Sequence, residues 1–213
     1  MNFGRRLDLL MLRKGKMKHK NKKKQTGMKL GVLFSGGKDS MLAAYLAQKE
    51  GYELSCLLSI FSLNKESYMF HTPMIEKVNA QAKIMEIPLL VGNTLGEKER
   101  ELDDLEELIV QAIKEFKIDG VVSGAVESVY QSTRIQKICN KLGIECFNPL
   151  WQMNQFDLLR LLLKYKFKVI VSGVFAYPFD DWYLGKEINE NFIEEMKVKN
   201  EKYKINPAGE GGE

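Results

Sequence analysis

The chain has 213 residues, of which 45% are hydrophobic, so it can bury a core and is neither fibrous nor wholly disordered. Its net charge of +4 comes from one end, because residues 1–27 hold ten lysines or arginines and a single acid. Residues 28–213 hold 22 basic and 27 acidic side chains, a net charge of −5, which argues against nucleic acid as a partner of the globular part.

Within residues 1–27, the stretch from Arg13 to Lys24 shows no hydrophobic periodicity and its like charges repel, so we expect 1–27 to be a disordered basic extension. Two interpretations are open: an arm that binds a polyanion, or a dispensable extension ahead of a natural start at Met28. The second fits better, because the first strand pattern begins directly after Met28. The apolar cluster in 1–12 is too short for a membrane span or a signal sequence, so we expect a soluble cytoplasmic protein.

From Met28 onward, short apolar segments alternate with helical patterns. The predicted strands are Lys29–Phe34, Glu53–Ile60, Pro88–Val91, Gly120–Ser123 and Glu145–Phe147. The clearest helical pattern runs from Leu102 to Phe116, with one apolar stripe and an acidic face that we interpret as solvated. This alternation predicts an α/β fold, in which residues 28–150 form a doubly wound, parallel, five-stranded sheet.

After Pro149 the pattern changes. Two helices are predicted at Asn154–Tyr165 and Asn189–Lys204, with a strand at Lys168–Val174 between them. We therefore expect residues 151–213 to form a smaller α+β lobe that completes the substrate side of a cleft.

Three cysteines, Cys56, Cys139 and Cys146, form no CxxC pair. This pattern argues against a disulfide framework and a four-thiolate metal site. Cys56 and Cys139 lie in apolar patterns, so we expect them to be buried as small hydrophobic residues.

The most informative motif is the hexapeptide 35–40, Ser-Gly-Gly-Lys-Asp-Ser, between the first strand and a helical pattern at Met41–Lys49. Its glycines allow a tight turn that presents N–H groups to an anion, next to the positive end of a helix. The P-loop pattern does not fit, because Val32 stands where that pattern needs glycine and Asp39 where it needs Ser or Thr. A purely structural helix entry is the alternative, but the flanking strand and helix favour nucleotide binding.

Three further motifs lie at 67–73, 123–134 and 206–213. In the second, Gly124 at a strand end permits close backbone approach, and Tyr130, Gln131 and Arg134 share one helix start where they could converge on an anion. Pairing of Arg134 with a surface acid is an equally good interpretation. In the first, His71 could orient a substrate or transfer protons, or be structural. The acids of the third could steer cations or belong to a flexible tail.

The hexapeptide resembles the signature of the PP-loop ATP pyrophosphatases, enzymes that split ATP into AMP and pyrophosphate. Together with the order and spacing of the other three motifs, it resembles the diphthine–ammonia ligase family from Met28 to the end of the chain. The segments Asn148–Trp151 and Trp182–Gly185 add to the resemblance. This resemblance implies an adenine nucleotide alpha hydrolase-like fold of the HUP type. It also implies ATP and Mg²⁺ as cofactors, and a ligase reaction that amidates the diphthine carboxylate of elongation factor 2 with ammonium through an acyl adenylate.

The resemblance also implies roles for individual residues. The expected catalytic residues are Lys38, Asp39 and His71, with Asp39 also the metal ligand. The expected ATP-binding residues are Ser35, Gly36, Gly37, Lys38, Asp39, Ser40 and Gly124. The expected substrate-binding residues are Tyr68, His71, Glu127, Ser128, Tyr130, Gln131, Arg134, Glu210 and Glu213.

Two departures from the family pattern stand out. Members usually have aspartate where Val129 stands, and usually continue past Glu213 into another strand. The completeness of the smaller lobe is therefore open. Alternative functions are a PP-loop enzyme that adenylates a tRNA base or another small carboxylate, and a non-catalytic ATP sensor. An oligomer is compatible with the sequence.

Overall fold

The computed structural model describes residues 27–62, 75–97, 99–174 and 177–209. The basic extension therefore lies outside the described residues, apart from Gly27, as do four of the expected site residues: Tyr68, His71, Glu210 and Glu213.

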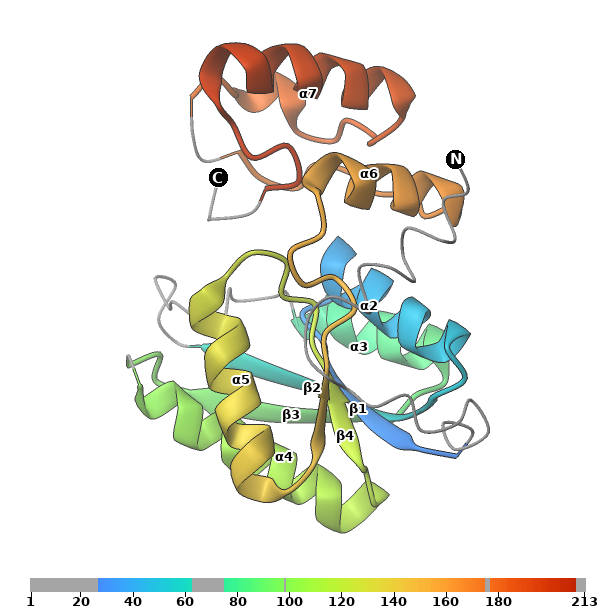
Figure 1. Ribbon diagram of the computed structural model, residues 1–213, viewed down its shortest axis with the longest axis vertical. Helices are drawn as coiled ribbons and strands as arrows, with labels where there is room; N and C mark the ends of the chain where they lie inside the picture. Colours follow the sequence, from blue (N-terminus) through green and yellow to red (C-terminus); the bar gives the residue numbers. More distant parts are fainter. Residues whose placement is uncertain (1–26, 63–74, 98, 175–176, 210–213) are drawn as a thin grey trace.

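Five parallel strands form one sheet in the order β3-β2-β1-β4-β5, which confirms the predicted α/β architecture (Figure 1). The strands are β1 Lys29–Leu33, β2 Glu53–Ser62, β3 Leu89–Thr94, β4 Gly120–Val122 and β5 Glu145–Phe147. The chain builds outward from β1 to β3 and then returns to add β4 on the other side of β1. Ligands of such sheets bind at the carboxyl ends of the strands where the order reverses, here between β1 and β4.

Helices cover both faces of the sheet (Figure 1). α2 (Lys38–Lys49) and α3 (Ile75–Met85) lie on one face, and α4 (Arg100–Phe116) and α5 (Val129–Leu142) lie on the other. Each face has its own apolar core, one containing Leu42 and Val78, the other Ile109 and Ile138. Cys56 and Cys139 are fully buried in the second core, as predicted.

The first core continues into the C-terminal part of the chain. α6 (Gln155–Lys164) and α7 (Glu190–Tyr203) contribute Leu158, Leu162 and Ile193 to the same apolar cluster as Leu42 of α2. Between α6 and α7 lies one 3-10 helix, η1 (Asp181–Tyr183). This part of the molecule is therefore packed on the sheet domain through a shared core.

The predicted strand at Lys168–Val174 is wrong in extent. Within the described residues this segment forms a single antiparallel bridge, from Ile170 to Glu187. Backbone hydrogen bonds flank the bridge, with the Ile188 N–H donating to the Val169 carbonyl at 2.8 Å. The partner segment is confined between η1 and α7 and is too short to extend a ladder.

The predicted start of the first helix also needs correction. α2 begins at Lys38 and not at Met41, so Lys38, Asp39 and Ser40 form its first turn. The sequence pattern missed this turn because its side chains are polar. Among the helices of the described ranges, none has the length and apolar character needed to cross a bilayer.

Candidate nucleotide and substrate site

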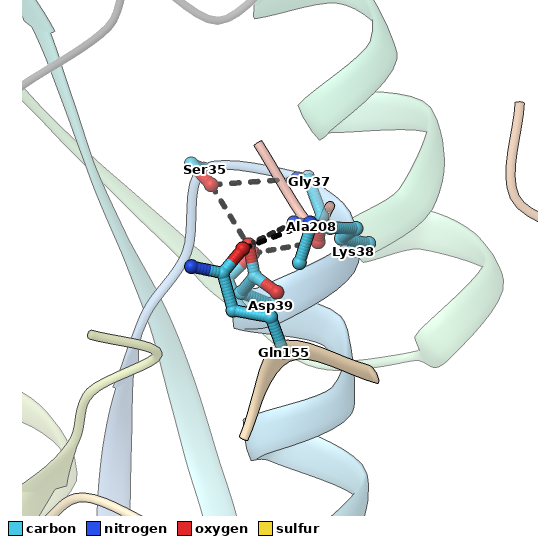
Figure 2. Close-up of polar contacts among 7 residues, drawn as sticks. Ser35, Gly37, Lys38, Asp39, Gln155 and Ala208 are labelled. Carbon is cyan, nitrogen blue, oxygen red and sulfur yellow. Dashed lines mark hydrogen bonds and ion pairs between the residues drawn. The ribbon is translucent and has the colours of Figure 1, made fainter. Parts of the chain in front are cut away.

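The hexapeptide forms the turn between β1 and α2, and its own hydroxyl groups brace it (Figure 2). Ser35 Oγ accepts from the Gly37 N–H at 3.4 Å and donates to Ser40 Oγ at 3.2 Å. Ser40 Oγ in turn donates to the Gly37 carbonyl at 3.1 Å. The two serines therefore fix the shape of the loop as well as offering hydroxyl groups at its edge.

The loop leaves the N-terminus of α2 without a side-chain cap, because the N-cap residue is Gly37. The first turn of a helix has N–H groups with no partner within the helix, and here they coincide with the positive end of the helix dipole. Gly36 adopts a φ of +76°, where a Cβ atom would also lie 2.5 Å from Gln81 Oε1. A side chain at this position would be strained by the positive φ, so glycine is favoured in the turn.

Lys38 and Asp39 form a close pair in the first turn of α2, with 2.6 Å between Lys38 Nζ and Asp39 Oδ2 (Figure 2). The other carboxylate oxygen, Asp39 Oδ1, is buried and has no hydrogen-bond partner among the described residues. An oxygen in this position fits a Mg²⁺ ligand, because Mg²⁺ is commonly held by one or two carboxylates together with substrate phosphates. Within the described ranges, no group of three or more acidic, Cys or His residues is arranged so that it could hold a metal ion.

The loop between β4 and α5 packs directly on this first turn. A Cβ atom on Gly124 would lie 2.9 Å from both the Asp39 carbonyl carbon and the Ser40 nitrogen. The close backbone approach expected at Gly124 is therefore real, but the partner visible here is the hexapeptide itself. The contact joins the two loops at the switch point between β1 and β4.

The start of α5 places Tyr130 and Arg134 together, but both contact Glu99. Arg134 Nε donates to Glu99 Oε1 at 3.0 Å, and the Tyr130 hydroxyl donates to the same oxygen at 3.2 Å. The Arg134 guanidinium also stacks 3.4 Å from the centre of the Tyr130 ring. The hydrogen bond to Glu99 raises the pKa of Arg134, and burial raises the pKa of Tyr130. Arg134 therefore pairs with an acid, which is one of the two interpretations drawn from the sequence. The role of Tyr130 and Arg134 in substrate binding stays a prediction.

Ser128 and Gln131 form a hydrogen bond with each other at the start of α5. Ser128 is the N-cap of α5, and its Oγ accepts from the Gln131 N–H at 3.3 Å. Such a cap stabilises the helix that carries Tyr130 and Arg134. The predicted substrate contacts of Ser128 and Gln131 remain untested, and the cap is the role that their geometry displays.

Glu127 is connected to the C-terminal part of the chain by Gln155, a residue that sequence reasoning missed. Gln155 Nε2 donates to Glu127 Oε2 at 3.0 Å, and Gln155 Oε1 accepts from the Ala208 N–H at 2.9 Å (Figure 2 draws the second contact). One signal was present: Gln155 shares the buried stripe of α6 with Leu158, Leu159 and Leu162, where a polar side chain needs a reason.

Comparison with known proteins decides the family. Residues 28–146 match the model of the diphthamide synthase N-terminal domain, and residues 154–213 match that of the C-terminal domain. The chain belongs to the diphthine–ammonia ligase family. The relatives named diphthine–ammonia ligase from Mus musculus and Rattus norvegicus are 31% and 30% identical over 207 residues. Each alignment covers 87% of this chain and 76% of the relative.

Among solved structures, a predicted subunit of a tRNA methyltransferase from Methanocaldococcus jannaschii aligns with a TM-score of 0.45 and 20% identity. That alignment covers 84% of this chain and 90% of the other. Membership of the diphthine–ammonia ligase family confirms the resemblance drawn from the motifs, and with it the prediction of a ligase. Both family models include the site segments described above, from the hexapeptide to Ala208.

Proposed function

We propose that this chain catalyses the ATP-dependent amidation of the diphthine carboxylate on elongation factor 2, with ammonium as the nitrogen donor and AMP and pyrophosphate as products. Membership of the diphthine–ammonia ligase family supports the class of reaction. The observation that carries the proposal is the uncapped N-terminus of α2, which lies in the turn of the hexapeptide beside the Lys38–Asp39 pair. A reaction on elongation factor 2 would take place in the cytoplasm.

In the first step, a carboxylate oxygen of diphthine attacks the α-phosphorus of ATP, and the bond from that phosphorus to the bridging oxygen of pyrophosphate breaks. Negative charge grows on the leaving pyrophosphate. The N–H groups of the first turn of α2 and the Lys38 ammonium stabilise this charge. Asp39 Oδ1 would hold Mg²⁺, which supplies further neutralisation of the phosphate oxygens when it is bound.

In the second step, ammonia attacks the carbonyl carbon of the acyl adenylate. The bond from this carbon to the AMP oxygen breaks, AMP leaves, and the attacking nitrogen loses a proton to give the amide. The first step requires the acceptor carboxylate to lie in line with the bond that breaks at the α-phosphorus, and the second requires ammonia to reach the acyl carbon. The loop of Gly124 packs on the backbone of Asp39, so it would lie beside a nucleotide held at the first turn of α2.

The deciding experiment combines the chain with ATP, Mg²⁺, ammonium and elongation factor 2 that carries diphthine. We expect AMP and pyrophosphate only when all are present, and conversion of the protein's carboxylate to a carboxamide, seen by mass spectrometry. Matched control reactions contain elongation factor 2 without diphthine.

Other outcomes identify the alternatives. AMP release that is stimulated by transfer RNA or by a small carboxylate, and not by the protein, would overturn the substrate and keep the chemistry. ATP binding without cleavage under every condition would overturn the enzyme and favour a sensor.

A further inference from the structure

Gln155 occupies an unusual position for a polar side chain. It is the first residue of α6 and only 7% exposed. Its amide nitrogen donates to Glu127 Oε2 at 3.0 Å and to Asn206 Oδ1 at 3.2 Å, and its amide oxygen accepts from the Ala208 N–H at 2.9 Å. The orientation of the amide is therefore set by its partners, since a backbone N–H needs the oxygen and the acceptors need the nitrogen.

This amide joins three segments that are distant in sequence. Glu127 lies in the β4–α5 loop, Gln155 begins α6, and Asn206 and Ala208 follow α7. The β4–α5 loop also contains Gly124, which packs against the backbone of Asp39. The β4–α5 loop therefore contacts the C-terminal segment through Glu127 and Gln155, and the first turn of α2 through Gly124.

No other side chain of similar size offers the same set of bonds. A carboxylate would lose both donors, and a hydrocarbon would leave the Ala208 N–H without its partner. A buried polar group that loses its partner costs about 1–3 kcal/mol. Position 155 therefore favours glutamine, because its amide supplies both the donors and the acceptor that these partners need.

Glu127 is the exposed member of this network, whereas Asn206 is half-buried and Gln155 and Ala208 are buried. Its carboxylate has one neutral partner, Gln155, and no ion pair with a lysine or arginine among the described residues. Its negative charge, held on one side by an amide, is therefore available to a cation from solvent. The proposed reaction uses two small cations, Mg²⁺ and ammonium. Because the buried Asp39 Oδ1 is the position assigned to Mg²⁺, ammonium is the cation that we assign to Glu127.

We propose that Gln155 is a positioning residue that holds the Glu127 carboxylate where it recruits ammonium to the amidation site. The inference rests on the proposed function and adds to it the residue that selects the nitrogen donor. On this proposal the β4–α5 loop and α6 position the nitrogen donor, and the hexapeptide positions the nucleotide.

The test compares Gln155→Met and Glu127→Gln with the unchanged enzyme, at constant pH, by measuring KM for ammonium, ATP and the acceptor protein separately. We expect KM for ammonium to rise roughly tenfold in each variant, as loss of one charge-assisted contact implies, with KM for ATP within about twofold. The double variant should be no worse than either single one, because both act through the same carboxylate. Gln111→Met, on the exposed face of α4, is the matched control.

A purely structural role predicts a different pattern. An equal rise in all three KM values, or an unchanged KM for ammonium, would overturn the inference and leave the proposed function intact. If Gln155→Met does not fold, Glu127→Gln still decides, because its side chain is exposed. A wild-type enzyme that forms no amide would overturn the proposed function itself, and this inference with it.

Discussion

Gly124 and Asp39 are 85 positions apart in the chain and touch through their backbones: a Cβ atom on Gly124 would lie 2.9 Å from the Asp39 carbonyl carbon. The neighbouring positions of β1 and β4 in the sheet bring their following loops together. The shape of the hexapeptide is therefore maintained from outside by a residue of the second motif.

Gly124→Ala should displace the first turn of α2, because the clashing atoms belong to backbone and cannot rotate away. We expect a loss of about 1–3 kcal/mol in the free energy of unfolding, as for overpacked sites, together with weaker ATP binding. Chemical denaturation and nucleotide titration measure the two effects. Gly92→Ala is the matched control, because a Cβ atom there would lie 3.5 Å from its nearest neighbours, side-chain carbons of Ile60 and Leu108. Equal behaviour of the two variants would contradict this account.

Lys38→Ala should keep the fold and lose pyrophosphate release. The side chain contributes charge at the start of α2 and is not part of either apolar core. Removal of a group that stabilises developing charge lowers the rate roughly 100-fold or more. Lys49→Ala, at the opposite end of the same helix, should retain the rate. A Lys38→Ala enzyme with unchanged turnover would rule out the assignment of the loop.

Substitutions of Arg134 and Glu99 should differ in their effect on KM for the acceptor protein. If Arg134 binds the acceptor carboxylate after leaving Glu99, Arg134→Met should raise KM for the acceptor protein roughly tenfold, while Glu99→Gln should leave it unchanged or lower it. Melting temperatures should change little in both, because exposed ion pairs contribute little to stability. Identical changes in KM in the two variants would instead indicate a structural pair.

Leu158→Ala tests whether the C-terminal part unfolds together with the sheet domain. Leu158 is fully buried in the cluster that also contains Leu42, so truncation should cost about 2–5 kcal/mol and leave one cooperative transition. Val198→Ala, on the exposed surface of α7, should be close to neutral. Two separated unfolding transitions would favour the independent lobe that the sequence pattern suggested after residue 150.

The three thiols should react with an alkylating reagent in a defined order. Burial raises the pKa of Cys56 to about 12, so its thiol stays protonated and unreactive at pH 8. A hydrogen bond from Cys139 lowers the pKa of Cys146, which increases its thiolate fraction, while the same contact together with burial raises the pKa of Cys139. Peptide mass spectrometry after brief iodoacetamide treatment should find Cys146 modified first. Early modification of Cys56 would show that the second core opens.

The sheet was predictable because its strands are short apolar runs, and because their alternation with helices indicates parallel pairing through crossover connections. Glu145–Phe147 was placed to the residue, and the other four strands within a few positions. The strand at Lys168–Val174 failed because a strand needs a partner of matching length, and the segment before α7 provides only one bridge. The helix start at Lys38 was missed because hydrophobic periodicity cannot detect a polar first turn.

The sequence by itself determined the turn of the hexapeptide between a strand and a helix, the parallel sheet and the family, since each depends on local residue types and their spacing. Only the tertiary structure decided which groups meet: Gly124 on Asp39, Arg134 on Glu99, and Gln155 between Glu127 and Ala208. These contacts join residues 28 or more positions apart. They arise from strand order and helix packing, so no local pattern in the sequence records them.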